Sequence, residues 1–465
     1  MRKGPRLLLA AGVVVGLLVP SAVAAASPPH FTPGSAGSGD PYFPDMGNGG
    51  YDVGHYDINL AFDPTTHAIA ATTKITARAT QNLSRFDLDF LGPLTISRLT
   101  VDGHKASFTR TGAQELVITP RRGLRRGSCF TVSVTYAGVP QKIDDDALGV
   151  SGWVATKDGA VGLNQPFGAA TYYPVNDSTR DKATYTQTVT VPTGLTVLGN
   201  GDPGRVTTKH GKTTFRWRMN QPMASELASI AIGKYTVTTG RAGRIPNITA
   251  IGTAIDTTPG RDALFNKTTA DLVKWESSMY GRYPFSSTGG LIDRIGVQYA
   301  LEVQSRPVYD QRSSTIDADT MAHELGHQWF GDSLTPAHWS DIWLNEGFAT
   351  YSEWLYQEKY HGTPVQTSFA KTYANTTDWS GKVADPGRDR IFDSLVYDRG
   401  AMTLQALRNT TGDRAFFAVL RQWPDQHRYG NVSTQEFIHF VEHLTHRNLD
   451  AFFTTWLYSE GKPAL

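Results

Sequence analysis

The stretch that decides the second half of this fold reads MAHELGHQWFG and occupies residues 321–331. Its apolar residues recur at helical spacing, with Met321 and Leu325 on one side. His323 and His327 stand four residues apart, just over one helical turn, so both imidazoles project from the same face. Two imidazole nitrogens placed in this way can hold one zinc ion at about 2.0–2.1 Å from each.

A catalytic zinc ion needs three protein ligands and one open position. Glu324, next to the first histidine, can reach a water molecule at the metal without binding the metal itself. Glu346 lies nineteen residues beyond His327 and opens a second helical pattern that runs to about Lys359. Its apolar neighbours indicate an interior position, where an unpaired carboxylate is costly. The residues therefore predict a His₂Glu zinc site with His323 and His327. The alternatives are two solvated histidines on a surface helix and an exposed acid at Glu346.

The first half of the chain has a different pattern. Short runs with alternating apolar residues, such as 56–62 and 185–191, are separated by turn dipeptides. They predict an all-β domain of antiparallel strands over residues 46–240. Helical spacing dominates afterwards, apart from a strand or two near 290–310, and predicts a mainly helical domain over 241–465. The expected fold class is therefore multidomain α+β.

The N-terminus has the pattern of a secretory signal peptide over residues 1–26. Basic residues precede the apolar run 7–18, and the small residues at 22–26 offer a cleavage site. A retained anchor is the alternative, although the apolar run is short for a membrane span. Residues 27–45 predict a flexible lead-in, because Ser, Pro and Gly are frequent at their start. We expect a secreted, extracellular protein without membrane attachment after signal removal.

The composition excludes several classes of protein. The 44 Lys and Arg residues nearly balance the 43 Asp and Glu residues, so no basic surface for nucleic acid is expected. Ten Trp, 19 Tyr and 21 Phe residues are too many aromatic residues for a disordered chain. Cys129 is the single cysteine, which excludes an intrachain disulfide.

The zinc pattern, His323-Glu324-x-x-His327 with Glu346 after eighteen intervening residues, resembles the signature of the gluzincin aminopeptidases, the family of aminopeptidase N and leukotriene hydrolase. Three further segments resemble family landmarks. They are YPVND at 173–177 in the β domain, LVYDRGA at 395–401 with the catalytic tyrosine, and FFTTWL at 452–457 near the close of the catalytic domain. The resemblance implies a saddle-like or sandwich-like β domain, a thermolysin-like zinc peptidase domain and one Zn²⁺ per chain.

The resemblance also implies roles for the matching residues. His323, His327 and Glu346 would hold the zinc ion. Glu324 would be the general base that takes a proton from the attacking water and later passes it to the leaving amine. Tyr397 would donate a hydrogen bond to the oxyanion of the tetrahedral intermediate.

Two further residues match the family's site for the free α-amine of the substrate. Glu302 matches the glutamate of the Gly-Ala-Met-Glu-Asn segment, which reads YALEV at 299–303 here, so Tyr299 replaces the glycine. Gln165 stands twelve residues before Asp177 and matches the second α-amine residue. Its alternative is an ordinary loop amide. A carboxylate and an amide oxygen that converge on an ammonium group form charge-assisted hydrogen bonds.

The resemblance thus implies a secreted zinc-dependent aminopeptidase that hydrolyses the N-terminal peptide bond, with peptide and protein N-termini as substrates. The alternatives are a thermolysin-like endopeptidase and a non-catalytic, peptide-binding family member. Larger relatives carry a C-terminal helical domain over the active site. This chain ends at Leu465, soon after the last landmark, so we expect a compact form with a more open cleft. The sequence does not indicate the oligomeric state or the preferred N-terminal residue.

Overall fold

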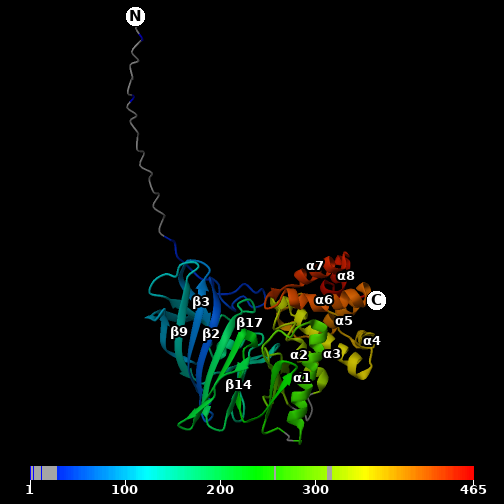
Figure 1. Cartoon of the computed structure of the whole chain (residues 1–465), viewed down its shortest axis with the longest axis horizontal. Coiled ribbons are helices and arrows are strands. Elements are labelled where there is room, and N and C mark those ends of the chain that lie inside the picture. The colour runs from blue at the N-terminus through cyan, green and yellow to red at the C-terminus, as the bar shows by residue number, and fades with distance from the viewer. Residues whose placement is uncertain (2–3, 5–11, 13–28, 256–257, 312–316) are drawn as a thin grey trace. The chain divides into compact units, whose positions relative to one another are not determined.

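The computed structural model describes residues 1, 4, 12, 29–255, 258–311 and 317–465. The predicted signal peptide, residues 1–26, lies almost wholly outside the described residues. Residues 31–465 form one compact unit. Within this unit strands make up the first half and helices most of the second (Figure 1), which confirms the predicted order of a β region followed by a mainly helical region. Among the described residues, no helix has both the length and the apolar character needed to cross a membrane.

The largest sheet of the N-terminal region has nine strands, with the antiparallel pair β2 (Tyr51–Phe62) and β3 (Ile69–Ala79) near its centre. Burial largely alternates along both strands, because successive side chains of a strand point to opposite faces. The strand order is β15-β17-β13-β2-β3-β9-β5-β6, with β16 also paired to β17. The other strands are β5 (Thr95–Val101), β6 (His104–Lys105), β9 (Cys129–Gly138), β13 (Ala183–Pro192), β15 (Asp202–Pro203), β16 (Thr207–Lys209) and β17 (Lys212–Met223).

Two smaller sheets complete this region, with the orders β1-β4-β8-β7 and β10-β11-β12-β18-β14. Most pairs are antiparallel, but β13 pairs with β2 in parallel and β1 pairs with β4 in parallel. These two pairs correct the prediction of antiparallel strands throughout, because strands that no short turn connects can pair in either direction. The strands are β1 (Thr32–Pro33), β4 (Leu83–Asp89), β7 (Ser107–Thr111), β8 (Glu115–Thr119), β10 (Lys142–Asp145), β11 (Gly149–Ala155), β12 (Ala160–Leu163), β14 (Thr196–Gly199) and β18 (Ile230–Gly233).

A five-stranded sheet of order β19-β20-β21-β23-β22 lies at the start of the C-terminal region. Successive residues of β21 enter different cores: Leu291 packs into the core of the N-terminal region and Ile292 into the helical core. The two cores therefore share this sheet. Residue 240, the predicted domain boundary, falls inside β19, and the division into 46–240 and 241–465 stays a prediction. The strands are β19 (Tyr235–Ala242), β20 (Ile245–Gly252), β21 (Thr288–Asp293), β22 (Ala300–Leu301) and β23 (Val308–Asp310), and a separate pair joins β24 (Thr335–Pro336) to β25 (Asn431–Val432).

Eight α-helices and several short helical segments form the rest of the described chain. The helices are α1 (Arg261–Tyr280), α2 (Ala318–Gly326), α3 (Trp343–Tyr356), α4 (Val365–Asn375), α5 (Ser394–Thr411), α6 (Asp413–Gln426), α7 (Thr434–Thr445) and α8 (Asp450–Phe453). The 3₁₀ segments are η1 (Ala169–Thr171), η2 (Ser225–Leu227), η3 (Trp339–Asp341) and η5 (Arg388–Arg390), and the π-helical segments are η4 (Gln357–His361) and η6 (Thr454–Tyr458).

The helical core anchors the two segments that carry the predicted zinc ligands. Trp329 follows α2 and Trp343 begins α3, and both indoles are fully buried. Burial of large apolar groups is the main favourable contribution to folding, so the two buried indoles hold their segments firmly.

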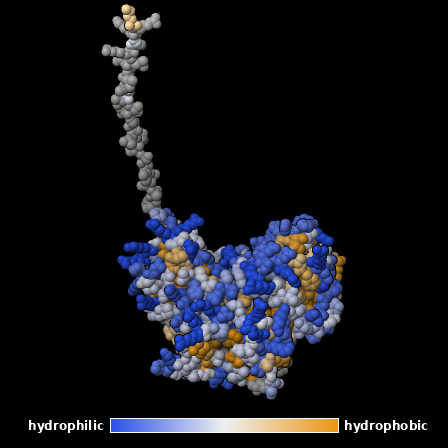
Figure 2. All heavy atoms as spheres, in the orientation of Figure 1, coloured by the Kyte–Doolittle hydropathy of each residue, from blue (hydrophilic) through white to orange (hydrophobic). Residues whose placement is uncertain are grey.

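The face of the protein in Figure 2 is mainly hydrophilic, and its hydrophobic residues form small patches.

The start of the described chain corrects one prediction. The sequence predicts a flexible lead-in over residues 27–45, but residues 31–45 are bound to the rest of the fold. Asp40 accepts one hydrogen bond from the backbone N–H of Trp339 at 2.9 Å, and Phe43 packs edge-on against Phe167 with ring centroids 4.5 Å apart. The Ser, Pro and Gly residues set the local conformation only, whereas the buried carboxylate and the aromatic ring fix the segment.

A two-point ion pair also links the N-terminal and C-terminal regions. Arg388 of η5 donates from Nη1 to Asp145 Oδ1 at 3.2 Å and from Nη2 to Asp145 Oδ2 at 2.5 Å. Asp145 ends β10 of the N-terminal region. A guanidinium and a carboxylate match in this geometry, so the pair forms two parallel hydrogen bonds between the two regions.

Candidate metal centre

The helix α2 begins after the capping residue Asp317 and ends one residue before His327. Asp317 caps its N-terminus, with the side-chain oxygen accepting from the backbone N–H of Thr320 at 2.8 Å. The α-helix ends at Gly326, and His327 follows in a helical backbone conformation, with φ −57° and ψ −24°. The imidazole of His327 therefore stays on the same side as that of His323, and the two ring centroids lie 4.8 Å apart.

The predicted third ligand meets the two histidines. Glu346 stands in the first turn of α3, and its Oε2 lies 3.4 Å from Nε2 of His323 and 3.4 Å from Nε2 of His327. The carboxylate of Glu346 and the imidazole of His327 are almost completely buried. The structure thus excludes the alternatives of an exposed acid and two solvated histidines.

The second ring nitrogen of each histidine has its own acceptor. Nδ1 of His323 lies 2.6 Å from Oε1 of Glu353, and Nδ1 of His327 lies 3.1 Å from the carbonyl oxygen of Phe330. A carboxylate and a carbonyl only accept, so each Nδ1 carries the proton and each neutral ring keeps its Nε2 lone pair for a metal.

The charges of the group favour a bound cation. Burial would by itself raise the pKa of Glu346, but the imidazoles of His327 and His323 outweigh it and lower that pKa to about 2. Burial would lower the pKa of His327, but the carboxylates of Glu302 and Glu346 raise it to about 9. The three side chains together therefore stabilise positive charge between them.

The donor set fits zinc. Two imidazole nitrogens and one carboxylate oxygen are borderline-soft and hard ligands that zinc accepts in catalytic sites, where a fourth position stays open. In a tetrahedron with zinc–ligand distances of about 2.0–2.1 Å, ligand atoms are about 3.3–3.4 Å apart. The distances of 3.4 Å from Glu346 to His323 and to His327 match this spacing.

Two further predicted residues, Glu324 and Tyr397, lie next to the group of proposed metal ligands. Ligand atoms of Glu324, His327 and Glu302 all lie within 4.8 Å of one another, so the acid beside the first histidine faces the metal position. The ring of Tyr397 stacks on His323 with centroids 6.0 Å apart and an angle of 18° between planes. Burial raises the pKa of the Tyr397 phenol well above its usual value, and the carboxylate of Glu346 raises it further, so the hydroxyl remains a donor.

Comparisons with known proteins decide the family. Residues 303–456 match the sequence model described as the peptidase family M1 domain. Aminopeptidase N of Streptomyces lividans is 27% identical over 308 residues, which cover 60% of this chain and 36% of that protein. The crystal structure of an M1 zinc metallopeptidase from Deinococcus radiodurans superposes on this fold with a TM-score of 0.83 and 29% identity, covering 92% of this chain and 98% of that chain. A mutant of the same protein superposes with a TM-score of 0.84. The chain belongs to the gluzincin aminopeptidase family.

The mitochondrial aminopeptidase 2 of Saccharomyces cerevisiae is another member of this family to which the chain is similar, with 22% identity over 461 residues. The match covers 88% of this chain and 46% of the yeast protein. The chain thus spans about half the length or less of these two curated aminopeptidases. Membership in the family implies one zinc ion, for which the His323, His327 and Glu346 group has the fitting donors.

The gluzincin aminopeptidase fold also brings the two predicted α-amine residues together. Gln165, which follows β12, donates from Nε2 to Oε1 of Glu302 at 2.6 Å, across 137 positions of sequence. Glu302 is buried and directly follows β22. Gln165 is therefore more than an isolated loop amide, since its side chain meets a carboxylate beside the metal group. Tyr299 points its hydroxyl away to the carbonyl oxygen of Val150 at 2.5 Å.

Two acidic residues around this site, Glu353 and Glu226, were not among the residues predicted from the sequence. Glu353, which binds His323, stands seven residues after Glu346, and this spacing of two helical turns on α3 is a signal that could have indicated it. Glu226 in η2 lies near Glu302, which raises its pKa, and near Gln165, which lowers it, and no local pattern in the sequence marks it.

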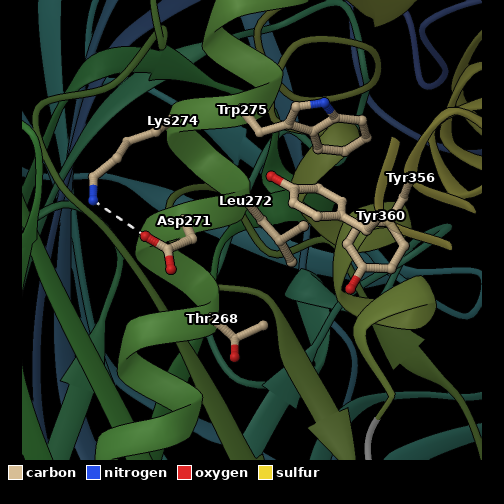
Figure 3. Close-up of a pocket in the computed structure, with 7 residues that line it drawn as sticks. All are labelled: Thr268, Asp271, Leu272, Lys274, Trp275, Tyr356 and Tyr360. Atoms are coloured by element: carbon tan, nitrogen blue, oxygen red, sulfur yellow. Dashed lines mark hydrogen bonds and ion pairs between the residues drawn. The ribbon is translucent and has the colours of Figure 1, made fainter. Parts of the chain in front are cut away.

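A separate cavity of about 490 Å³ lies between α1 and the end of α3 (Figure 3). Aromatic rings of Trp275, Tyr356 and Tyr360 lie on one side, and Asp271 pairs with Lys274 at its edge. None of the predicted site residues lines it, so this cavity does not belong to the candidate metal centre.

Proposed function

We propose that this protein is a secreted zinc-dependent aminopeptidase that removes single residues from the N-terminus of peptides. The observation that carries the proposal is the convergence of His323, His327 and Glu346 beside the Gln165–Glu302 pair. The two curated relatives named above are aminopeptidases, and the similar Deinococcus protein is a zinc metallopeptidase.

His323, His327 and Glu346 would hold the zinc ion in this proposal. When bound, zinc supplies a Lewis acid that polarises a carbonyl group and lowers the pKa of water toward about 7. The Nδ1 contacts to Glu353 and Phe330 keep each imidazole in the tautomer that this role requires.

Glu324 would move the proton. Its carboxylate faces His327 and Glu302 at the metal position, and Oε2 has no hydrogen-bond partner among the described residues. It can accept a proton from the attacking water and then donate that proton to the amine that leaves. Tyr397 would donate its hydroxyl hydrogen to the developing oxyanion, a role that its raised pKa and its stacking on His323 support.

Glu302 and Gln165 would bind the substrate's α-ammonium group. This pair distinguishes an aminopeptidase from a thermolysin-like endopeptidase, because an ammonium anchor beside the metal position selects the first peptide bond. A mutant of the Deinococcus protein was crystallised with a Tyr-Ser-Ala substrate, which is consistent with short peptides as ligands.

Secretion is the second part of the proposal and rests on residues 1–26. Expression of the full chain in a secreting bacterial host, with N-terminal sequencing of the protein found in the medium, tests it. We expect a mature N-terminus near residue 27. Retention of the intact chain in the cytoplasm contradicts this part of the proposal.

A panel of aminoacyl fluorogenic amides, with and without a zinc chelator, tests the activity. We expect hydrolysis that the chelator abolishes and zinc restores. Short peptides with an acetylated α-amine should resist cleavage, whereas the same peptides with a free α-amine should be cleaved. Cleavage of the acetylated peptides at internal bonds supports the endopeptidase instead. No hydrolysis by the wild type, together with unchanged peptide binding by Glu324→Gln, supports the non-catalytic alternative.

A further inference from the structure

The carboxyl group of Glu226 is buried beside the proposed α-amine site, and no described residue gives it a hydrogen bond of normal geometry. Glu226 is 2% exposed, and neither of its side-chain oxygens has a partner of normal hydrogen-bond geometry among the described residues. Leaving a buried carboxyl group without hydrogen bonds usually costs more than replacing it by an apolar side chain. Such a group indicates a role that stability does not explain.

The neighbours of Glu226 are the two residues proposed to bind the ammonium group. Burial raises the pKa of Glu226 well above its usual value, and the Glu302 carboxylate raises it further. The Lys182 ammonium and the Gln165 amide lower it, so the Gln165 side chain lies close to Glu226 while it donates to Glu302. The amide of Gln165 therefore stands between two carboxyl groups.

The segments that carry these side chains are tied together on both sides. Asn164 donates from Nδ2 to the carbonyl oxygen of Ser225 at 3.1 Å, and Ser225 donates from Oγ to Asp177 at 2.7 Å. Burial raises the pKa of Asp177 to about 6, although the hydrogen bonds from Ser225 and from backbone N–H groups at Gly168, Ala169 and Ala170 oppose this rise. Asn164 and Ser225, which precede Gln165 and Glu226, are thus joined by a direct hydrogen bond, and Asp177 holds Ser225 in place.

The segment of Glu302 is tied to the same place. The backbone N–H of Gln304 donates to the carbonyl oxygen of Leu227 at 3.3 Å. Asn200 donates from Nδ2 to the carbonyl oxygens of Leu227 and Gln304, both at 2.9 Å. Glu226 precedes Leu227, and Glu302 lies two residues before Gln304. These hydrogen bonds therefore join η2, which carries Glu226, to the segment after β22, which carries Glu302.

We propose that Glu226 is a positioning residue of the α-amine site, which accepts the second N–H of Gln165 while Glu302 accepts the first. An amide has two N–H donors and one carbonyl oxygen. With both N–H groups held by carboxyl groups, the oxygen is the part of Gln165 left for a ligand. This oxygen accepts from an ammonium group, so Glu226 sets the preference for substrates with a free α-amine. The inference rests on the proposed aminopeptidase function.

The test is the replacement Glu226→Leu, with kinetics on the best aminoacyl amide of the panel. The freed Gln165 amide can turn its N–H groups toward the ammonium, so we expect KM to rise about tenfold while kcat stays within about twofold of the wild type. The thermal midpoint should stay equal or rise, because an apolar side chain replaces a buried carboxyl group. A rise in KM without loss of stability separates positioning from a structural role.

Two inhibitors sharpen the test. L-Leucinamide carries the α-ammonium group and 4-methylpentanamide lacks it. We expect Glu226→Leu to weaken competitive inhibition by L-leucinamide about tenfold and to leave inhibition by 4-methylpentanamide unchanged. Equal changes for both inhibitors overturn the proposal.

Glu226→Gln and Glu276→Leu are the matched controls. Glutamine keeps an acceptor oxygen, so KM should stay within about threefold of the wild type. A glutamine variant as weak as the leucine variant overturns the proposal. Glu276 of α1 is another buried carboxylate for which the described part of the chain offers no hydrogen-bond partner, and burial alone raises its pKa, so Glu276→Leu should leave KM unchanged.

A KM within twofold of the wild type in Glu226→Leu overturns the inference. If this variant does not fold, Glu226→Ala removes the acceptor without adding bulk, and the same expectations apply. Failure of the proposed function is distinguishable, because it shows as absence of chelator-sensitive hydrolysis in the wild type. An active wild type with an unaltered KM in the variant overturns the inference alone.

Discussion

Gly347 of α3 and Gly400 of α5 meet backbone to backbone. A Cβ atom added to Gly400 would lie 2.8 Å from Cα of Gly347, and one added to Gly347 would lie 2.9 Å from Cα of Gly400. Glu346 precedes the first glycine, and Tyr397 stands one helical turn before the second. The absence of two side chains therefore lets the helix with the third proposed metal ligand approach the helix with the proposed oxyanion donor.

The first prediction concerns this crossing. Gly400→Ala should separate α3 from α5, because backbone atoms cannot give way as a flexible side chain can. We expect a loss of about 1–3 kcal/mol in the free energy of unfolding, typical of overpacking. Displacement of Tyr397 should lower kcat about tenfold to 100-fold. Urea unfolding and steady-state kinetics measure both effects.

Gly54→Ala provides the control, because a Cβ there would meet nothing closer than the carbonyl oxygen of Thr76 at 3.8 Å. It should change kcat little. Normal stability and normal kcat in Gly400→Ala would show that the crossing tolerates a methyl group and has no influence on the site.

The second prediction concerns Glu353, which binds Nδ1 of His323 at 2.6 Å. Glu353→Gln should weaken zinc binding about 10-fold to 100-fold, as is usual when an acceptor behind a metal-binding histidine is altered. Competition with a chromophoric chelator measures the affinity. Glu358→Gln is the control, since Glu358 accepts from the backbone N–H of Val365 and does not contact either histidine. Equal zinc affinities for both variants would contradict the assigned contact.

The third prediction concerns metal removal. A ligand that binds only the folded protein stabilises it by about 2.7 kcal/mol at a concentration 100 times its Kd. A chelator should therefore lower the unfolding midpoint, and zinc should restore it whereas magnesium should not. His327→Gln should lack the zinc-dependent shift. His361→Gln, in the exposed end of η4, should retain it. If neither the chelator nor zinc changes the unfolding midpoint of the wild type, the result argues against the metal centre.

The fourth prediction concerns pH and the pair of Asp145 with Arg388. The hydrogen bonds from Arg388 lower the pKa of Asp145 to about 2, against the small opposing effect of burial. The folded pKa lies below the unfolded value of about 3.9, so the stabilisation is complete above pH about 4 and disappears as pH falls through about 2. The partly exposed pair should contribute up to about 1 kcal/mol.

Asp145→Asn should therefore reduce stability at pH 6, where urea unfolding of the two proteins should differ most. The difference should shrink at pH 3 and in high salt, because salt screens a solvent-exposed pair. Asp144→Asn is the control, since Asp144 pairs only with the exposed Lys142. A difference between wild type and Asp145→Asn that grows on acidification would contradict the sign of this prediction.

Much of the fold could be predicted from the sequence because its signals are local. Alternating burial in β2 and β3 follows from the period of a strand, and the shared face of His323 and His327 follows from the pitch of a helix. The parallel pairing of β13 with β2 and the fixed position of Phe43 were not predictable in this way. Both depend on contacts between distant segments, about which local periodicity carries no information.

The amino-acid sequence by itself determined that two imidazoles share one face of α2, that Glu324 follows the first of them, and that strands precede helices, because each depends on neighbours within a few residues. Only the tertiary structure decided that Glu346 stands 3.4 Å from both histidines, that Gln165 reaches Glu302, and that Glu226 and Glu353 lie behind them. The physical reason is that such distances are set by how buried surfaces pack, including the contact of Gly347 with Gly400, and packing joins residues that no spacing along the chain relates.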